Sequence, residues 1–345
     1  MIRKLAKLKT NKELWEPYWV REQVIDAIRA YFKVRGFHEV ETPLLLKAPS
    51  TEPFLEVFET SLTNDLGQSR QAFLPTSPEF AMKKLLCAGS GSIFQLTKSF
   101  RNGEGASPRH NPEFTILEWY ETPGDYMSVA KDFEKLMKFI LQKIAPDSSK
   151  LSYKGKEYDL SRPWEKISVA QAFSRYAGID TETMLSEAKL KEQAKQKGYQ
   201  VTPETTWEQV WNQIIANEIE PKLGLTGPTI LYDYPISQAA LAKKASDGRF
   251  AERWEVFMAG MELGNCFSEL SDAQEQEARC EADLLERKKL GRREYPLDQD
   301  FIEALKMGLP DTGGIAVGVD RLAMLFADAD SIDEVVFFPA SEIFV

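Results

Sequence analysis

Arginines, carboxylates and an aromatic ring are concentrated in one stretch of the sequence. Residues 100–104 read FRNGE, residues 109–114 read RHNPEF, and Glu118 follows. A guanidinium at the end of a strand could hold a carboxylate and a phosphate together, because its planar fork bonds two oxygens at once. A phenylalanine on the neighbouring strand could offer a flat face to a base. One Arg–Glu pair would equally fit a surface hairpin, but the whole string on a strand, loop and strand favours a binding site.

Two further groups of residues could complete such a site. Glu255 and Glu262 lie on predicted adjacent strands and could share a hard cation, since Mg²⁺ prefers a few carboxylates together with substrate phosphates. Asn265, Phe267 and Glu269 alternate with a period of two, so their side chains point to one face of a strand. An amide, a ring and a carboxylate on one face suit a cationic, amphipathic ligand, although a half-exposed strand explains this segment equally well.

Glycines mark a third segment, GGIAVGVDR at residues 313–321. Glycines on a strand allow a backbone or a ligand to approach closely, and Arg321 is expected to open the helix that follows. Packing explains a glycine-rich strand as often as ligand binding does. The segment therefore supports a binding site only in combination with the arginine-rich string.

Periodicity and the positions of glycine and proline predict the elements that position these residues. An amphipathic helix is expected over 19–35, ended by Gly36, and a strand over 37–45. A second helix begins near residue 77, with Ser77 as its cap. Further strands are expected at 92–100, at 113–121 and at the start of 313–326, and the segment 253–270 is expected to form two strands joined by Ala259 and Gly260. Helices are expected at 126–145, at 272–292 and at the end of 313–326.

This order of elements predicts an α+β fold with an antiparallel sheet flanked by helices. No repeat or low-complexity linker divides the chain, so we expect a single domain over residues 1–345. The stretch from about 180 to 225 is polar and helical and is predicted to be an insertion on this domain.

Composition and charge exclude several classes of protein. The 345 residues carry 43 Lys and Arg against 53 Asp and Glu, a net charge of −10, so the chain lacks the broad basic footprint of a protein that grips long nucleic acid. Cys87, Cys266 and Cys280 fit neither a metal site nor a disulfide framework, and two histidines exclude a multi-histidine metal site. The basic N-terminal segment lacks the apolar core of a secretion signal and no run approaches 18 apolar residues, so a cytoplasmic protein without a membrane span is expected.

Together these strings resemble the catalytic domain of class II aminoacyl-tRNA synthetases of the lysyl type, from about residue 15 to the C-terminus. Pro43 resembles the end of the family's first motif, a dimer-interface element. Residues 100–118 resemble the second motif and GIAVGVDR at 314–321 the third. NCFSELSDAQEQ, from residue 265, is close to the lysyl-type NGFSELNDAEDQ. Because the first motif's helix begins near residue 19, we expect no anticodon-binding domain.

Four departures from the synthetases resemble the elongation factor P–(R)-β-lysine ligases, a family of truncated lysyl-synthetase paralogues. The chain has SPEF at 77–80 where synthetases usually read APEL, and FRNGEG at 100–105 where they read FRNEG. It has Ala316 where they have glycine, and the string YPISQAALA at 234–242 is unlike theirs. The ligases activate β-lysine as an adenylate and attach it to a lysine side chain of elongation factor P.

Two positions bear on the choice of substrate. The methyl group of Ala316 would narrow the pocket near the substrate backbone, which disfavours an α-amino group and tolerates one moved by a carbon. Cys266 stands where both families usually have glycine, and a side chain there is expected to tilt Asn265 or Phe267.

The resemblance implies a two-step reaction and a role for each matching residue. Arg101 would bridge the substrate carboxylate and the α-phosphate of ATP, and Arg321 would hold the γ-phosphate, so both are expected to be catalytic. Glu79 would bind the amino group nearer the carboxylate, and Glu269 with Tyr120 the distal ammonium. The other implied residues are Glu104, His110, Asn111, Phe114 and Glu262 for ATP, Glu255 and Glu262 for Mg²⁺, and Ser77, Glu118, Asn265, Phe267 and Ala316 for the amino acid.

The expected partners are elongation factor P, lysine or β-lysine, and a second copy of the chain in a homodimer. The acidic balance fits a protein better than tRNA, whose backbone needs Lys and Arg for neutralisation. A minimal lysyl transferase acting on tRNA or on a small molecule would share every catalytic residue and stays open. A non-catalytic amino-acid sensor is disfavoured, because a sensor has no need of residues that hold a metal ion and a triphosphate. An ammonia-dependent asparagine synthetase is also disfavoured, because its pocket would not need an acid such as Glu269.

Overall fold

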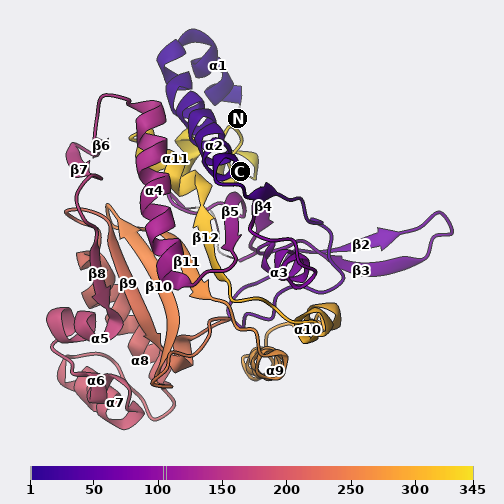
Figure 1. The fold of residues 1–345 in the computed structure, drawn as a ribbon, viewed down its shortest axis with the longest axis vertical. Coiled ribbons are helices and arrows are strands. Elements are labelled where there is room, and N and C mark those ends of the chain that lie inside the picture. The colour runs from indigo at the N-terminus through magenta and orange to yellow at the C-terminus, as the bar shows by residue number, and fades with distance from the viewer. Residues whose placement is uncertain (1, 104, 106, 345) are drawn as a thin grey trace.

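The computed structural model describes residues 2–103, 105 and 107–344, and its centre is an eight-stranded sheet (Figure 1). The edge strands β1 and β8 run parallel to their neighbours β4 and β9, and all other pairs are antiparallel. In spatial order the strands are β1 (His38–Glu39), β4 (Ile93–Phe100), β5 (Glu113–Glu121), β12 (Gly313–Gly318), β11 (Met261–Ser268), β10 (Phe250–Met258), β9 (Thr229–Pro235) and β8 (Glu165–Ser168). The predicted α+β fold with an antiparallel sheet is confirmed.

Three helices cover one face of this sheet and enclose the main core (Figure 1). They are α2 (Glu16–Val34), α4 (Tyr126–Ile144) and α11 (Val319–Phe326). On that face Trp119, Ile315, Cys266 and Trp254 are register neighbours on β5, β12, β11 and β10, and all four are fully buried or nearly so. Because side chains alternate along a strand, the residues between them face the other side of the sheet.

The opening helix follows the predicted pattern, whereas the strand after it is much shorter than predicted. In α2 the predicted apolar positions Val20, Val24 and Ile28 are buried, and Gly36 with φ +79° ends the helix. Of the strand predicted over 37–45, only β1 forms. His38 and Val40 donate to the Ser92 and Phe94 carbonyls, and the chain then leaves the sheet edge ahead of Pro43, which has no N–H to donate to a ladder.

The second predicted helix and the hairpin at 253–270 also form. Helix α3 (Glu79–Cys87) begins one residue later than a Ser77 cap would place it, and the Ser77 hydroxyl accepts the Glu79 N–H at 3.0 Å. Ala259 and Gly260, with φ of +53° and +69°, make the two-residue turn between β10 and β11. Beyond this hairpin the chain forms α9 (Ala273–Lys289) and α10 (Gln299–Lys306).

A group of short helices lies between β8 and β9 and packs its own apolar cluster, including Phe173, Trp211 and Ile219 (Figure 1). The group comprises α5 (Val169–Ala172), α6 (Thr181–Met184), α7 (Glu187–Gln196) and α8 (Trp207–Ile214), two π-helical turns (Phe173–Ala177, Ile215–Ile219) and a 3₁₀ turn (Glu220–Lys222). Its position covers the helical stretch expected at 180–225. That this stretch is an insertion in a single domain stays a prediction.

Among the remaining elements, the β2–β3 hairpin projects far from the body (Figure 1). They are β2 (Glu59–Thr63), β3 (Ser69–Phe73), β6 (Lys150–Tyr153), β7 (Lys156–Asp159), α1 (Ile2–Thr10), α12 (Ala340–Ile343) and 3₁₀ turns at Lys12–Trp15, Ile236–Gln238 and Ile332–Glu334. Within the described ranges, no helix combines the length and the apolar character needed to cross a membrane.

Candidate active site

A cavity of about 560 Å³ lies on the sheet face opposite α2, α4 and α11. Its floor is formed by β5, β12 and β11, and its walls by the start of α3, the segment 52–55, the string at 234–242 and parts of α8 and α9. Of the predicted site residues, the cavity is lined by Ser77, Glu79, Arg101, His110, Asn111, Phe114, Glu118, Tyr120, Glu262, Asn265, Phe267, Glu269, Ala316 and Arg321. Glu104 lies outside the described residues.

Sheet register explains why residues so far apart in sequence meet here. One row across the floor runs Glu118, Ala316, Asn265 on adjacent strands, and continues to Glu255 on β10. Two residues along the strands, a second row runs Tyr120, Gly314, Phe267 and Arg253. Opposed residues in an antiparallel pair share a face, so both rows project into the cavity side of the sheet.

Glycine at position 314 is required by this crowding. A Cβ atom built on Gly314 would overlap the Glu269 carboxylate and the Tyr120 ring. The glycine-rich strand therefore serves the pocket at this position, because it allows two polar side chains to lie directly above its backbone.

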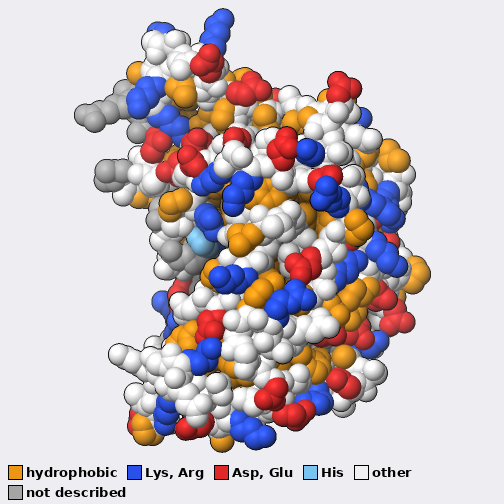
Figure 2. All heavy atoms as spheres, turned by 90° about the vertical axis from the view of Figure 1, so that its left-hand side faces the viewer, with side chains coloured by type: hydrophobic (Ala, Val, Ile, Leu, Met, Phe, Trp, Pro, Cys, Tyr) orange, Lys and Arg blue, Asp and Glu red, His pale blue; other side chains and the backbone are white. Residues whose placement is uncertain are grey.

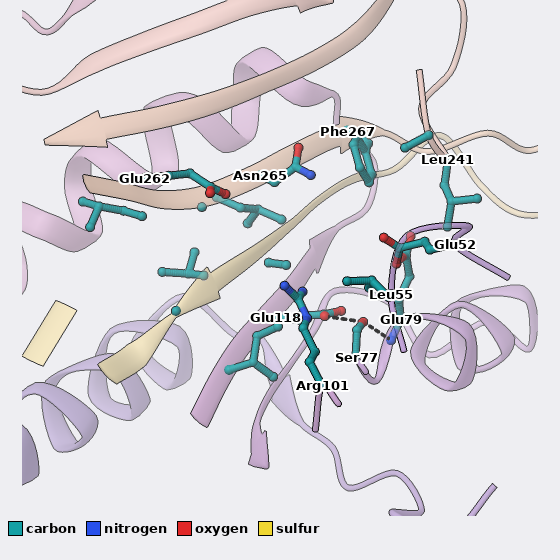
Figure 3. Close-up of a pocket in the computed structure, with 18 of the residues that line it drawn as sticks. Glu52, Leu55, Ser77, Glu79, Arg101, Glu118, Leu241, Glu262, Asn265 and Phe267 are labelled. Atoms are coloured by element: carbon teal, nitrogen blue, oxygen red, sulfur yellow. Dashed lines mark hydrogen bonds between the residues drawn. The ribbon is translucent and has the colours of Figure 1, made fainter. Parts of the chain in front are cut away.

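The acidic end of the cavity contains Glu118 in a closed hydrogen-bond set. Its carboxylate accepts from the Ser77 hydroxyl at 2.6 Å (Figure 3) and from the Tyr120 hydroxyl at 3.0 Å. Burial, followed by the nearby Glu79 carboxylate, raises the pKa of Glu118 to about 8 although both hydroxyls oppose the shift. Glu118 is therefore largely protonated near neutral pH in the unliganded protein.

Glu79 and Glu269 meet in the same region through a lysine that the sequence analysis did not single out. Lys83 Nζ lies 2.6 Å from Glu79 Oε1 and 2.5 Å from Glu269 Oε2. Burial raises the pKa of Glu269 to about 7, and the Lys83 ammonium limits this rise. Helical spacing was the available signal, because Lys83 follows Glu79 by four residues on one face of α3.

The affinity for an amine-bearing ligand is expected to depend on pH. Below pH 7 Glu118 and Glu269 hold protons, and as pH rises through 7 and 8 they ionise and can each accept from an ammonium group. The KM for a diamino acid at pH 6 should therefore exceed its value at pH 8.5 by about tenfold or more. Ser77→Ala removes a donor that favours the ionised carboxylate, so the midpoint should move upward. A midpoint that stays in place when KM is measured across this range would contradict the assignment.

The other end of the cavity brings together Arg321, His110 and Glu262. Arg321 donates to the Glu262 carbonyl at 2.7 Å and lies 3.5 Å from its carboxylate. His110 Nε2 is 3.1 Å from Arg321 NH2, and a guanidinium can only donate, so Nε2 is the acceptor and the ring proton sits on Nδ1, 2.9 Å from the Ser107 hydroxyl. These groups form a partly exposed cluster suited to phosphate oxygens.

Arg101 and Phe114 lie between the two ends. The Arg101 guanidinium carbon is 5.2 Å from the centre of the Phe114 ring, and the side chain extends toward the middle of the cavity (Figure 3). Asn111 lines the cavity, but its amide is bonded within the protein, to the Glu113 carbonyl at 2.5 Å and the Ala340 N–H at 2.8 Å. Asn111 thereby holds the loop against the C-terminal helix.

Arg253 was missed by sequence reasoning although it stands two residues before Glu255. It donates to the Asn265 side-chain oxygen at 3.1 Å, to the Gln238 carbonyl at 2.5 Å and to Glu255 at 2.6 Å, and it stacks on Tyr234 at 4.4 Å. Because the Asn265 oxygen is used, its NH₂ group is left to donate into the cavity (Figure 3).

The two carboxylates predicted to hold Mg²⁺ are neighbours, but only Glu262 lines the cavity. Burial raises the pKa of Glu255 to about 6, Arg253 lowers it, and Glu262 is close enough to raise it further. Glu262 faces the cavity beside Glu255, and two adjacent carboxylates fit a shared Mg²⁺ that takes its other ligands from phosphates. Among the described residues, no group of three or more His, Cys, Asp or Glu side chains is arranged to hold a metal ion by itself.

Cys266 does not reach the pocket, contrary to the expectation that it would tilt Asn265 or Phe267. Its side chain is fully buried on the opposite face, within the core under α4, and its Sγ lies 3.9 Å from the Tyr126 carbonyl. The alternation of side chains along β11 accounts for this placement. The neighbouring residues keep the cavity-facing positions that their spacing predicts.

Comparison with known proteins identifies the family. A family model described as tRNA synthetases class II (D, K and N) matches residues 3–342. The chain belongs to this family. An elongation factor P–(R)-β-lysine ligase from Mannheimia succiniciproducens is 37% identical over 95% of this chain and 98% of its own length, and one from Avibacterium paragallinarum is 38% identical over 92% and 93%. The predicted resemblance to these ligases is confirmed.

The lysine–tRNA ligases are similar over only part of their length. The enzyme from Staphylococcus saprophyticus is 34% identical over 96% of this chain, and the chain spans 65% of that protein.

Proposed function

We propose that this protein activates lysine or (R)-β-lysine with ATP as an aminoacyl adenylate, with release of pyrophosphate, and transfers the aminoacyl group to a lysine side chain of elongation factor P, with release of AMP. The observation that carries the proposal is the division of one cavity into an acidic end with Glu79, Glu118 and Glu269 and a cationic end with Arg321. Such a cavity matches a diamino acid at one end and a triphosphate at the other. Relatives of nearly the same length are named as this ligase.

Adenylate formation needs positioning and charge neutralisation more than a general base, because the attacking carboxylate is already ionised. Arg101 neutralises that carboxylate and the α-phosphate together, and Phe114 stacks on the adenine. Arg321 and His110 bind the outer phosphates. Asn265 donates its NH₂ group to an oxygen of the substrate, and the acidic end orients the two amino groups.

Glu262 and Glu255 are the residues that would hold Mg²⁺, which neutralises phosphate charge when bound. Glu262 faces the cavity and Arg321, so it would contact the ion directly. Arg253 orients Glu255 beside it.

The acceptor is proposed to be a protein. The net charge of −10 disfavours a tRNA backbone, and on the face shown in Figure 2 basic and acidic side chains are interspersed without a continuous basic field. We also propose a homodimer formed through the segment after β1, where Leu44 and Leu45 are 40% and 43% exposed.

The test is a transfer assay read by intact mass. The protein is incubated with ATP, Mg²⁺ and elongation factor P, with α-lysine or (R)-β-lysine supplied in parallel. A gain of one lysyl unit on the factor, larger with the β isomer, is expected. No gain with either isomer, together with amino-acid-dependent exchange of pyrophosphate into ATP, would reject this acceptor while retaining the activation step.

A lysyl transferase acting on tRNA is the second candidate, because lysine–tRNA ligases match 96% of the chain. The same preparation is tested for charging of total tRNA. Charged tRNA with unmodified elongation factor P would favour this candidate over the first.

Ala316 is expected to set the preference between the two isomers. It lies in register between Glu118 and Asn265, so its methyl group occupies the centre of the cavity floor. Ala316→Gly should raise kcat/KM for α-lysine relative to (R)-β-lysine by about tenfold, since a lost methyl contact is worth about 1–3 kcal/mol. An unchanged ratio of the two kcat/KM values in pyrophosphate exchange would reject this role.

A further inference from the structure

Lys83 places a positive charge inside the acidic end of the cavity wall. Its side chain is only 1% exposed and contacts two carboxylates, Glu79 one turn earlier on α3 and Glu269 directly after β11. Burial by itself would lower the pKa of Lys83, but the two carboxylates more than offset this and raise it well above its ordinary value. The lysine is therefore a fixed cation that joins a helix to the sheet.

We propose that Lys83 is a positioning residue for amine recognition, which holds the Glu79 and Glu269 carboxylates in one geometry and offsets part of the acidic charge at this end. The proposal rests on the proposed function. Glu52 adds a further carboxyl beside Glu79 in the same cavity, so carboxyl groups outnumber the single Lys83 ammonium there. A buried site with this excess of acid suits a ligand that brings ammonium groups of its own.

The contacts leave one oxygen of Glu269 on the cavity side. Lys83 binds Glu79 through Oε1 and Glu269 through Oε2. The Glu269 Oε1 atom instead lies above Gly314 on the cavity floor. Lys83 thus takes the rear oxygen of Glu269 and directs the front one toward the cavity.

Several other titratable groups lie near this lysine and its two carboxylate partners. They are Glu52, Cys87 on α3, Glu118 and Tyr120 on β5, Cys266 on β11, and Cys280 on α9.

The experiment compares Lys83→Met with wild type in amino-acid-dependent pyrophosphate exchange. We expect KM for the activated lysine isomer to rise about 30-fold or more, while KM for ATP stays within about twofold, because only the amine end is disturbed. The acidic limb of kcat/KM for the amino acid should move up by about one to three pH units, since Glu269 loses the ammonium group that limits the rise of its pKa. A purely structural lysine would not move this limb. Lys83→Arg should restore part of the lost KM.

Lys84→Met is the matched control. Lys84 is the next residue on the same helix, and its Nζ forms an ion pair of 2.6 Å with Asp298 outside the cavity. Both KM values should stay within about twofold of wild type.

Lys83→Ala with added n-propylammonium covers the case in which the methionine variant does not fold. The amine should restore activity and raise the melting temperature, whereas tetramethylammonium, which has no N–H donor, should do neither. Unchanged KM and pH limb in Lys83→Met, or no rescue by the amine, would overturn the role of Lys83 alone. A wild-type protein that activates neither lysine isomer would overturn the proposed function, and the role of Lys83 with it.

Discussion

Arg101→Lys is expected to lower kcat for amino-acid-dependent pyrophosphate exchange by about 10²- to 10³-fold while leaving the fold intact. A lysine keeps the charge but loses the planar fork that can bond a carboxylate and a phosphate together. The structure places this guanidinium in the cavity over the Phe114 ring, between the acidic end and the end that contains Arg321. The substitution therefore removes an interaction that exists fully only when the two reacting groups meet.

Arg29→Lys is the control for this change. Arg29 is 43% exposed and pairs with Glu39 at 2.8 Å on the surface, so its replacement should leave the rate unchanged. If Arg101→Lys raises only the KM for ATP and leaves kcat unchanged, the arginine binds ATP but does not act in adenylate formation. Single-turnover measurement of adenylate formation separates the two results.

Gly314→Ala is expected to lower kcat/KM for the amino acid by about 100-fold, the cost of displacing the groups that hold a substrate by about 1 Å. The new methyl group would overlap the Glu269 carboxylate and the Tyr120 ring, so both must move from the acidic end. The KM for ATP should change little, because Arg321 and His110 lie at the other end. Steady-state exchange kinetics with each substrate varied in turn provide the measurement.

Gly227→Ala tests whether any added methyl group would have this effect. A Cβ there meets no atom within 4 Å and the backbone has no positive φ, so activity and melting temperature should match wild type. If Gly314→Ala binds the amino acid as well as wild type, the position of Glu269 is not what determines affinity.

Local pattern predicts the floor of the site well. The period of two in Asn265, Phe267 and Glu269 placed them on one face, and the structure confirms that all three line one cavity. The C-terminal end of α2 and the Ala259–Gly260 turn were also predictable, because glycine and short-range periodicity decide them, whereas α2 begins at Glu16, three residues before the predicted start. These features depend on residues close together in the chain.

Features set by distant contacts could not be read from the sequence. The strand after α2 is short because the chain leaves the edge of the sheet, which no local pattern reports. Cys266 is harmless to the cavity because the core under α4 accommodates its sulfur. Asn111 is bonded to a helix 229 residues later, so a residue predicted from its motif to bind ATP also holds the C-terminus. The roles of Arg253 and Lys83 depend on partner residues that only the folded chain brings close to them.

The row of Glu118, Ala316 and Asn265 lies on three neighbouring strands whose backbones are held by the sheet ladder on both sides. A side-chain change in this row alters the depth of the cavity in steps of one carbon atom. The residues of the same strands that face the opposite side of the sheet form the core and are left unchanged. Saturation mutagenesis of Ala316 alone would therefore be an economical start for a library of variants that accept diamino acids of other chain lengths. The same arrangement offers natural selection a way to exchange one amino acid for another without rebuilding the protein.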